Sequence, residues 1–196
     1  ISYDASGNPV AIATGSDGQV LTSTGAGSPP AFEALPAGGI TEVDMWRISS
    51  SLSLSAGTLT TVSANWERVD TGGFAKIGTG MTNSNGTWTF PSTGIWKVDF
   101  HALFSNSAVS SRYSILGIFT STNGGTDYTE ELTLRTNLHN SGSSSYGSAA
   151  GSYIFDVTAT ANTRFYQRAI TSATGSLSGN TGVAETYFTF VKLAET

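Results

Sequence analysis

Apolar and polar side chains alternate along much of the chain beyond residue 40, and the clearest example is the stretch 94–104. One face of this stretch carries Trp96, Val98, Phe100, Ala102 and Phe104, and the other carries Lys97, Asp99 and His101. A period of two residues predicts a β-strand with one buried face. No stretch sustains apolar residues at helical spacing, so we expect little helix.

Two further stretches, 112–119 and 187–193, are apolar on both faces, which predicts strands in the centre of a sheet or against a partner. The dipeptides Asn85-Gly86 and Asn123-Gly124 are strong turn signals. Shorter segments predict further strands at 43–48, 58–62, 66–69, 74–77, 87–90, 128–136, 145–157 and 164–170. About ten short strands at this spacing predict an all-β fold, a jelly-roll β-sandwich.

Residues 1–40 differ from the remainder of the chain. No Lys or Arg precedes Arg47, and large apolar side chains are too few to close a core. A ten-residue pattern repeats, because 6–15 and 16–25 share Ser, Val, Thr and Gly at four positions. We therefore expect an extended, repeat-like stem at 1–40 and a globular knob at 41–196. The stem residues expected to contact other copies of the chain are Val10, Ile12, Val20, Leu21 and Phe32. A flexible Gly/Ser linker is the alternative.

The composition supports strands and turns and excludes several classes of protein. The chain has 28 serines, 28 threonines and 23 glycines, while only 12% of its residues are charged. The net charge of −5 and the scattered basic residues argue against a nucleic-acid partner. The absence of cysteine excludes disulfides, cysteine zinc sites and thiol nucleophiles. The apolar runs are far shorter than the roughly 20 residues that span a bilayer, so we expect no membrane insertion.

No arrangement of residues in the sequence is typical of catalysis, and we expect no enzyme, no cofactor and no metal. His101 and His139 have no second ligand at metal-binding spacing, and a structural or interface role is expected for His101. Asp127, Glu130 and Glu131 form the one carboxylate cluster. They have the chemistry to bind calcium, but a solvated strand edge is the interpretation we favour.

Tyrosines beside turns rich in Ser, Gly and Asn indicate a recognition surface, since this composition is typical of adaptable binding loops. The candidates are Tyr113, Tyr128, Tyr146 and Tyr153. The loops expected to bind are 105–112, 121–128, 138–148 and 171–183. The other aromatic residues on alternating strands, such as Trp88 and Phe90, are expected in the core.

The segment NGTWTFPSTGIWKVDFH at 85–101 is similar to the signature of the complement/TNF-like jelly roll, in particular to the globular head of the first complement component. Trp88 and Trp96 replace two aromatic residues of that family, and Val98 stands where its last Phe would be. The closing segment YFTFVKL at 187–193 resembles the terminal strand of the family, which pairs near a trimer axis. This resemblance implies a homotrimer with Phe188 and Phe190 among its contacts.

A second resemblance lies towards the beginning of the chain. The segment GSDGQVLTSTGAGSPPAF at 15–32 resembles the stem repeats of bacteriophage tail-fibre and virion-appendage proteins. ITEVDMWR at 40–47, ERVDTGGF at 67–74 and IGTGM at 77–81 resemble structural proteins of marine phages. These resemblances imply a trimeric appendage without enzymatic activity on the surface of a virion, extracellular after release.

The expected function is therefore that of a non-enzymatic phage structural protein, a homotrimeric fibre or capsid-decoration knob. Its stem would dock on other virion proteins, and its jelly roll would attach to a host cell-surface glycan or protein, or stabilise the capsid. The alternative is a secreted carbohydrate-binding or adhesive module with a calcium-dependent loop. A polysaccharide depolymerase is disfavoured, because it needs paired carboxylates. Only weak pairs are offered by Asp99, Asp127, Glu130, Glu131 and Asp156.

Overall fold

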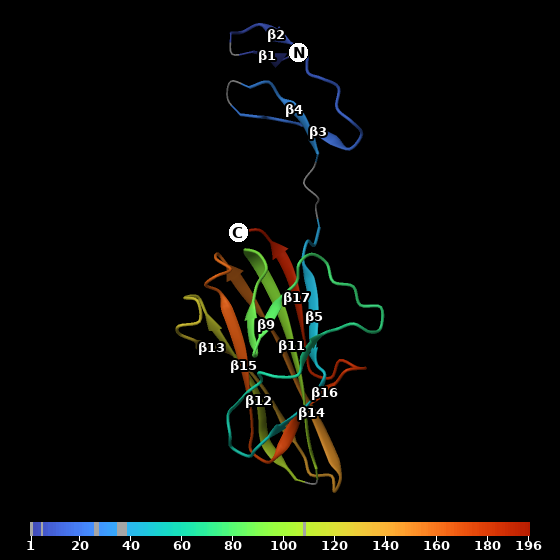
Figure 1. The fold of residues 1–196 in the computed structure, drawn as a ribbon, viewed down its shortest axis with the longest axis vertical. Helices are drawn as coiled ribbons and strands as arrows, with labels where there is room; N and C mark the ends of the chain where they lie inside the picture. The colour runs from blue at the N-terminus through green and yellow to red at the C-terminus, as the bar shows by residue number, and fades with distance from the viewer. Residues whose placement is uncertain (1, 5, 26–27, 35–38, 108) are drawn as a thin grey trace. The chain divides into compact units, whose positions relative to one another are not determined.

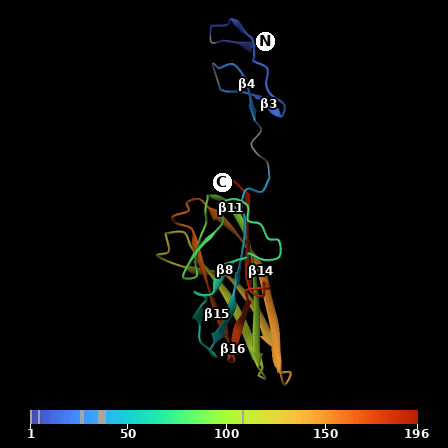
Figure 2. The same cartoon turned by 45° about the vertical axis from the view of Figure 1, so that its right-hand side comes forward.

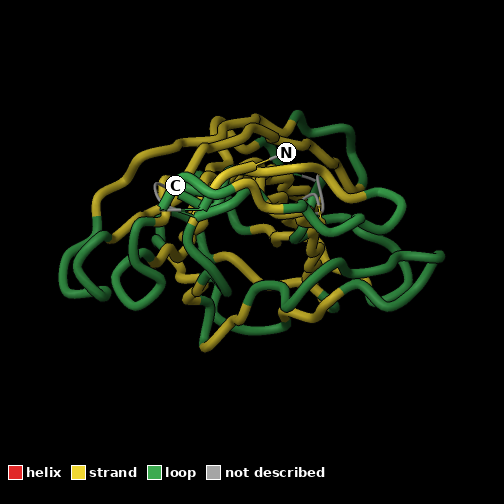
Figure 3. The backbone as a smooth tube through the Cα atoms, turned by 90° about the horizontal axis from the view of Figure 1, so that it is seen from above, coloured by secondary structure: helices red, strands yellow, loops and turns green. Residues whose placement is uncertain are grey.

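The computed structural model of the chain describes residues 2–4, 6–25, 28–34, 39–107 and 109–196. These residues divide into two compact units, Ile1–Gly39 and Ile40–Thr196. All of the described residues are strand, turn or loop and none is helix, as the colours of Figure 3 show. The described part of the chain accordingly has no helix of the length and apolar character that a membrane span requires.

The first unit contains two small antiparallel sheets. In one of them β1 (Ser2–Tyr3) pairs with β2 (Pro9–Val10), and in the other β3 (Gln19–Thr22) pairs with β4 (Ala31–Ala34). Val10 lies in β2 and Val20 in β3, so both copies of the ten-residue pattern place their valine in a strand. Of the stem expected at 1–40, residues 1, 5, 26–27 and 35–38 lie outside the described residues.

The second unit is a β-sandwich, whose two layers are visible in Figures 1 and 2. One layer, the β11 sheet, has the order β6-β16-β11-β17-β5-β8. β14 also belongs to this sheet and pairs along the edge of β11 opposite to β17. Its strands are β5 (Val43–Ile48), β6 (Ser50–Leu54), β8 (Trp66–Arg68), β11 (Gly94–Ser107), β14 (Ser144–Val157), β16 (Gly175–Asn180) and β17 (Tyr187–Ala194).

The other layer, the β12 sheet, has the order β13-β12-β15-β10-β9, with the short strand β7 beside β15. Its strands are β7 (Thr60–Thr61), β9 (Thr82–Ser84), β10 (Thr87–Thr89), β12 (Ser111–Ser121), β13 (Thr129–Leu138) and β15 (Arg164–Thr171). All pairings between the named strands are antiparallel. The prediction of an all-β sandwich is confirmed, and β12 is central in its sheet as its two apolar faces indicate.

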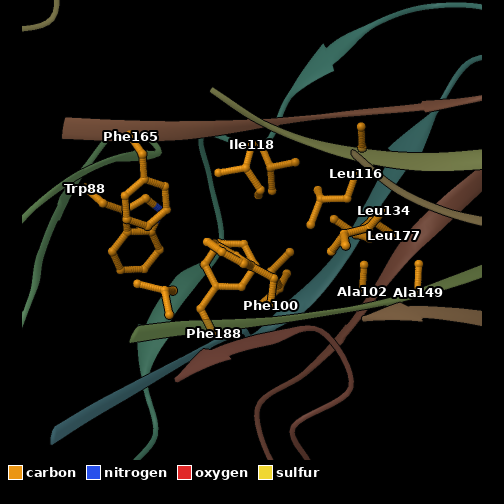
Figure 4. Packing of buried hydrophobic residues seen from close by; sticks show 14 of the residues in the cluster. Trp88, Phe100, Ala102, Leu116, Ile118, Leu134, Ala149, Phe165, Leu177 and Phe188 are labelled. Atoms are coloured by element: carbon orange, nitrogen blue, oxygen red, sulfur yellow. The ribbon is translucent and has the colours of Figure 1, made fainter. Parts of the chain in front are cut away.

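The core lies between the two sheets and is dominated by aromatic rings. Figure 4 shows Phe165 and Ile118 of one sheet pointing toward Phe100 and Phe188 of the other. Trp88 is fully buried and has its ring 5.9 Å from that of Phe165, nearly parallel to it. The alternation in 94–104 places Trp96, Val98, Phe100, Ala102 and Phe104 in this core, as predicted. Burying such large side chains supplies most of the driving force for folding.

The buried Trp88 also has its polar atom satisfied. Its indole Nε1 donates to Gln167 Oε1 at 2.8 Å, and Gln167 Nε2 donates to the carbonyl of Val62 at 2.6 Å. Trp66 Nε1 donates to the same carbonyl at 3.0 Å. A buried amide therefore links β15 to the segment after β7, and the tryptophan avoids the cost of an unpaired donor.

One predicted strand was wrong, and three strands of the sandwich were not predicted. The segment 74–77 forms only an isolated bridge between Ile77 and Val43, because glycines at positive φ on both sides, including Gly73 and Gly78, interrupt extended pairing. The strands β6, β9 and β16 were not predicted. Their sequences are SSLSL, TNS and GSLSGN, so they pair through the backbone with little apolar alternation to signal them.

The strand registers define the two ends of the sandwich. At one end Gly94 lies opposite Val157 and Ile95 opposite Ala194, so this end carries the C-terminus, marked in Figure 1. At the other, the distal end, Ser107 lies opposite Ser144. The loops 109–110, 139–143 and 172–174 lie at the distal end, because the strands that they join end there.

Candidate functional site

The first candidate surface is the outer side of the β11 sheet, here called the β11 face. His101 of β11 lies between Ala150 of β14 and Tyr187 of β17. The rings of His101 and Tyr187 stack with centroids 4.9 Å apart, and His101 Nδ1 lies 2.7 Å from the carbonyl oxygen of Glu185. The ring stacking on Tyr187 and the contact with the Glu185 carbonyl both fit the structural or interface role expected for His101. A shallow hollow of about 310 Å³ lies between these strands.

The β11 face is mostly uncharged. Lys97 and Asp99 form one ion pair at 2.7 Å, and much of the neighbouring surface is small or apolar. Along β14 this face carries Tyr146, Ser148, Ala150, Ser152, Ile154 and, at the end of the strand, the exposed Asp156. Tyr146 is 66% exposed and Ile154 is 51% exposed. Exposed apolar side chains beside small residues on a flat sheet are typical of a surface that another protein covers.

The second candidate surface is the outer side of the β12 sheet, here called the β12 face. Phe119 and Tyr166 lie directly opposite each other on β12 and β15 and stack with centroids 5.1 Å apart. Tyr128 packs edge-on against Tyr166 at 4.6 Å, and the guanidinium of Arg168 lies over Phe119 at 5.8 Å. The three rings form a row that ends at the guanidinium of Arg168. The face of the Phe119 ring attracts this positive charge.

The four tyrosines predicted to form one recognition surface are spread over different parts of the sandwich. Tyr146 is exposed at the distal end of the β11 face, and Tyr113 is half-buried on β12. Tyr128 precedes β13 at the opposite end of the sandwich and is half-buried against Tyr166. The structure therefore does not bring these residues together.

The prediction for Tyr153 is corrected by the structure. Tyr153 pairs with Val98, whose side chain faces the core, so it points inward and packs against Phe155 with ring centroids 4.9 Å apart. Burial, with a smaller contribution from the charge of Glu131, raises the pKa of Tyr153. The alternation of β14 places it on the opposite side from Tyr146, seven residues away.

The predicted trimer contacts Phe188 and Phe190 are also corrected. Both side chains are fully buried within a single chain and pack against Trp88, at 5.8 Å and 5.2 Å between ring centroids. They belong to the core, and Tyr187 of the same strand faces outward instead. In the first unit, Val20, Leu21 and Phe32 are exposed, whereas Val10 and Ile12 are half-buried. The role of these five residues stays a prediction.

The predicted binding loops are similarly divided. Loops 105–112, 138–148 and the beginning of 171–183 lie at the distal end, although residue 108 is outside the described residues. Loop 121–128 lies at the other end, where Ser121 pairs with Arg164. The segment 171–183 is not one loop, because it contains β16 with Leu177 and Ser178 buried.

The acidic residues near β13 make local hydrogen bonds. Asp127 Oδ2 accepts from Asn123 Nδ2 at 2.9 Å, and Glu130 Oε1 accepts from Thr133 Oγ1 at 2.7 Å. Within the described ranges, no group of three or more His, Asp or Glu side chains is placed to hold a metal ion. Glu130 and Glu131 lie on an exposed edge strand of the β12 sheet, the location that the strand-edge interpretation requires.

A buried ionic cluster fastens the loop that follows β8. Arg47 is only 1% exposed and donates to Glu67 at 2.7 Å, to Asp70 at 2.8 Å and to Thr71 at 2.8 Å. Burial raises the pKa of Glu67, but the hydrogen bonds and charge of Arg47 more than offset this, so the pKa is lowered. No sequence pattern indicates this cluster, since its partners lie 20 or more residues from Arg47.

Comparison with known proteins defines the class of this fold as a TNF-like jelly roll. No family model matches the chain, and no curated protein matches it. Among solved structures, it is similar to Eiger TNF from S. frugiperda, with a TM-score of 0.58 and 12% identity over 79% of this chain and 93% of that one. It is also similar to murine APRIL, with a TM-score of 0.51 and 17% identity over 78% of this chain and 98% of that one. The jelly roll expected from 85–101 and 187–193 is confirmed at the level of the fold.

Proposed function

We propose that the chain is a non-enzymatic structural protein of a bacteriophage virion. It assembles as a homotrimer through the β11 face, docks on the particle through residues 1–40 and projects its jelly roll outward. The projecting jelly roll attaches the particle to a host surface or decorates the capsid. The observation that carries this proposal is the largely uncharged β11 face with its exposed Tyr146 and Ile154.

Self-association is supported by the distribution of apolar surface. A β-sheet packed on one side normally carries polar side chains on the other. On the β11 face, however, Leu103, Tyr187 and Val191 are half-buried and Ile154 is exposed, and the β14 residues from Ser148 to Ser152 on this face are two serines and an alanine. Covering the part of this face between Tyr146 and Ile154 with a second copy removes apolar area from water without burying unpaired charge, because the exposed Asp156 lies beyond it at the end of β14.

The virion role is supported by the first unit and by the resemblances of 15–32, 40–47 and 67–74. The four described strands of the first unit are two to four residues long and form only two-stranded sheets. Isolated two-stranded sheets are marginally stable in water. The exposed Leu21 and Phe32 therefore fit a segment that gains stability from other chains.

The oligomeric state of the purified chain tests this proposal. Multi-angle light scattering should give about three times the 20.3 kDa chain mass. Ile154→Asp places a charge on the β11 face and should shift the protein to monomer. Leu59→Asp makes the same kind of change on the other side of the sandwich and should leave the mass unchanged. A monomeric wild-type chain, or an Ile154→Asp variant that assembles normally, contradicts the proposed assembly.

The location is tested separately. Antibodies raised against the purified chain should label particles of the phage whose genome encodes it, viewed by electron microscopy. Labelling at the tail tip supports attachment, whereas labelling over the head supports decoration. Particles that lack the protein altogether contradict the virion role.

A further inference from the structure

Most cations of the chain either form ion pairs or lie on one sheet of the sandwich. Four arginines form no ion pair with any described residue, and all four lie on strands of the β12 sheet: Arg112, Arg135, Arg164 and Arg168. The other cations are Arg47, Arg68, Lys97 and Lys192, which pair with carboxylates, and Lys76, which donates to the carbonyls of Gly78 and Thr79. On a chain with a net charge of −5, this concentration of uncompensated positive charge points to an acidic ligand.

Arg168 is held in place without using its terminal nitrogens. Its guanidinium lies over Phe119, which is itself stacked on Tyr166. Its Nε is buried and has no hydrogen-bond partner among the described residues, whereas its terminal nitrogens are not buried. A guanidinium positioned by an aromatic ring, with its outer donors open, is preorganised to bind a carboxylate in a bidentate manner.

A hollow of about 180 Å³ lies next to this guanidinium. Gly117 forms part of its floor, with Arg168 directly beside it on β15 and Thr133 directly beside it on β13. Arg135 lies two residues further along β13 than Thr133, opposite Ile115. The complete lining is Leu59, Ile115, Gly117, Phe119, Glu130, Thr133, Arg135, Arg168 and Ile170. Two arginines, one carboxylate, one hydroxyl and several apolar side chains thus meet in one small space.

We propose that this hollow binds an acidic sugar, one uronate unit of a polysaccharide chain, and this inference rests on the proposed attachment function. Arg168 and Arg135 bind the sugar carboxylate, and the sugar hydroxyls donate to Glu130 and to the hydroxyl oxygen of Thr133, whose own proton is donated to Glu130. The apolar wall of Ile115 contacts the carbon skeleton of the ring. The volume is below the roughly 300–1,000 Å³ of pockets that enclose drug-sized ligands, so it fits one unit of a longer chain.

Glu130 favours a sugar over a nucleic acid as the occupant. A nucleic-acid surface gains its affinity by neutralising successive phosphates with Lys and Arg. Here the carboxylate of Glu130 lines the hollow itself, and Glu131 is exposed beside it. A phosphate backbone carries a charge on every unit and would be repelled at this point, whereas a uronate turns its one carboxylate to the arginines and its uncharged hydroxyls to Glu130.

Binding of alginate oligomers, which are chains of uronate units, tests the proposal, with dextran oligomers of equal length as the neutral reference. Isothermal titration calorimetry should detect binding of alginate, weakening as salt is raised, and none of dextran. Arg135→Gln and Arg168→Gln together should weaken alginate binding by about tenfold or more, since each removes a charge-assisted hydrogen bond. Arg112→Gln removes the same charge from the same sheet outside the hollow and should change the affinity less than about twofold.

Each other outcome overturns the inference. Equal binding of dextran shows that charge is not recognised, and an equal effect of Arg112→Gln shows that the hollow is not the site. Single-stranded DNA that binds more tightly than alginate, with the same dependence on Arg135 and Arg168, makes the surface a nucleic-acid site. Thermal unfolding checks that the Arg168→Gln variant is folded. If the double variant does not fold, the single variant Arg135→Gln, at an exposed position, is used for the binding test instead. A trimer by light scattering that binds no alginate overturns this inference and leaves the proposed assembly intact.

Discussion

The Arg47 cluster predicts an asymmetry between the two ways of removing its charges. Arg47 is 1% exposed, whereas its partners Glu67 and Asp70 are 29% and 72% exposed. When Arg47→Met removes the guanidinium, both carboxylates have water within reach. The free energy of unfolding should fall by only about 1–2 kcal/mol, the value of a few partly solvated hydrogen bonds. The methionine side chain refills most of the vacated space.

The reverse change should cost more. Glu67→Leu and Asp70→Ala together leave the buried guanidinium with Thr71 as its remaining partner. An uncompensated buried charge lowers the free energy of unfolding by about 3–5 kcal/mol. Urea denaturation of both variants and the wild type measures these values, provided that the dependence on urea concentration is unchanged. An Arg47→Met variant as unstable as the double variant refutes the reasoning. The loss in free energy of unfolding would then not depend on whether the charge left unpaired is buried or exposed.

The pH dependence of the same proteins gives an independent check. Because the folded-state pKa of Glu67 is lowered, the stabilisation that it contributes is present above its ordinary pKa. It is lost as the pH falls through the lowered value, where the carboxylate takes up a proton in the folded state. Arg47→Met removes the hydrogen bond and the charge of Arg47 and leaves the hydrogen bond from Thr181, so its free energy of unfolding should depend less on pH in this acidic range. Parallel pH profiles of the two proteins contradict this.

Two further changes test the core and a turn by the free energy of unfolding in urea. Gln167→Leu keeps the side-chain volume but leaves the indole N–H of Trp88 unpaired in the core, so we expect a loss of about 1–3 kcal/mol. An unchanged stability would show that another group accepts this hydrogen bond. Gly94→Ala places a Cβ 2.5 Å from the carbonyl oxygen of Ala194 at a φ of +135°, whereas Gly142→Ala has a φ of +78° and open space around it. The first should destabilise more than the second, for which about 1–2 kcal/mol is expected, and the reverse order contradicts the steric argument.

The parts of the fold that follow from local alternation could be predicted from the sequence. The period of two in 94–104 predicts β11 because apolar and polar residues there face different environments, one the core and one the outer surface. β16 has no such contrast, since GSLSGN is built of small residues that suit a turn as well as a strand. Its strand character comes from backbone pairing with β6 and β11, which are distant in sequence. Pairing between strands that are distant in sequence cannot be predicted from local composition.

The candidate sites were less predictable for a related reason. Tyr153 and Tyr146 have similar neighbours in the sequence, and only the register of β14 against β11 decides which one faces the core. Arg135 and Arg168 are separated along the chain, and their proximity follows from the pairing of β13 and β15 with β12. Phe188 and Phe190 were assigned to the wrong environment because alternation shows that one face is apolar without showing what covers it.

The separation of an uncharged face from an arginine-bearing face has a consequence for the strength of attachment. In a trimer assembled through the β11 face, three copies of the β12 face point away from the shared interface, each with its own hollow. A polysaccharide coat offers many identical units, so under the proposed attachment function one particle would engage several of them at once. Weak single contacts then combine into strong adhesion through their high effective concentration. Each proposed contact would be individually short-lived, so the bound particle would move along the coat by exchanging one unit for the next.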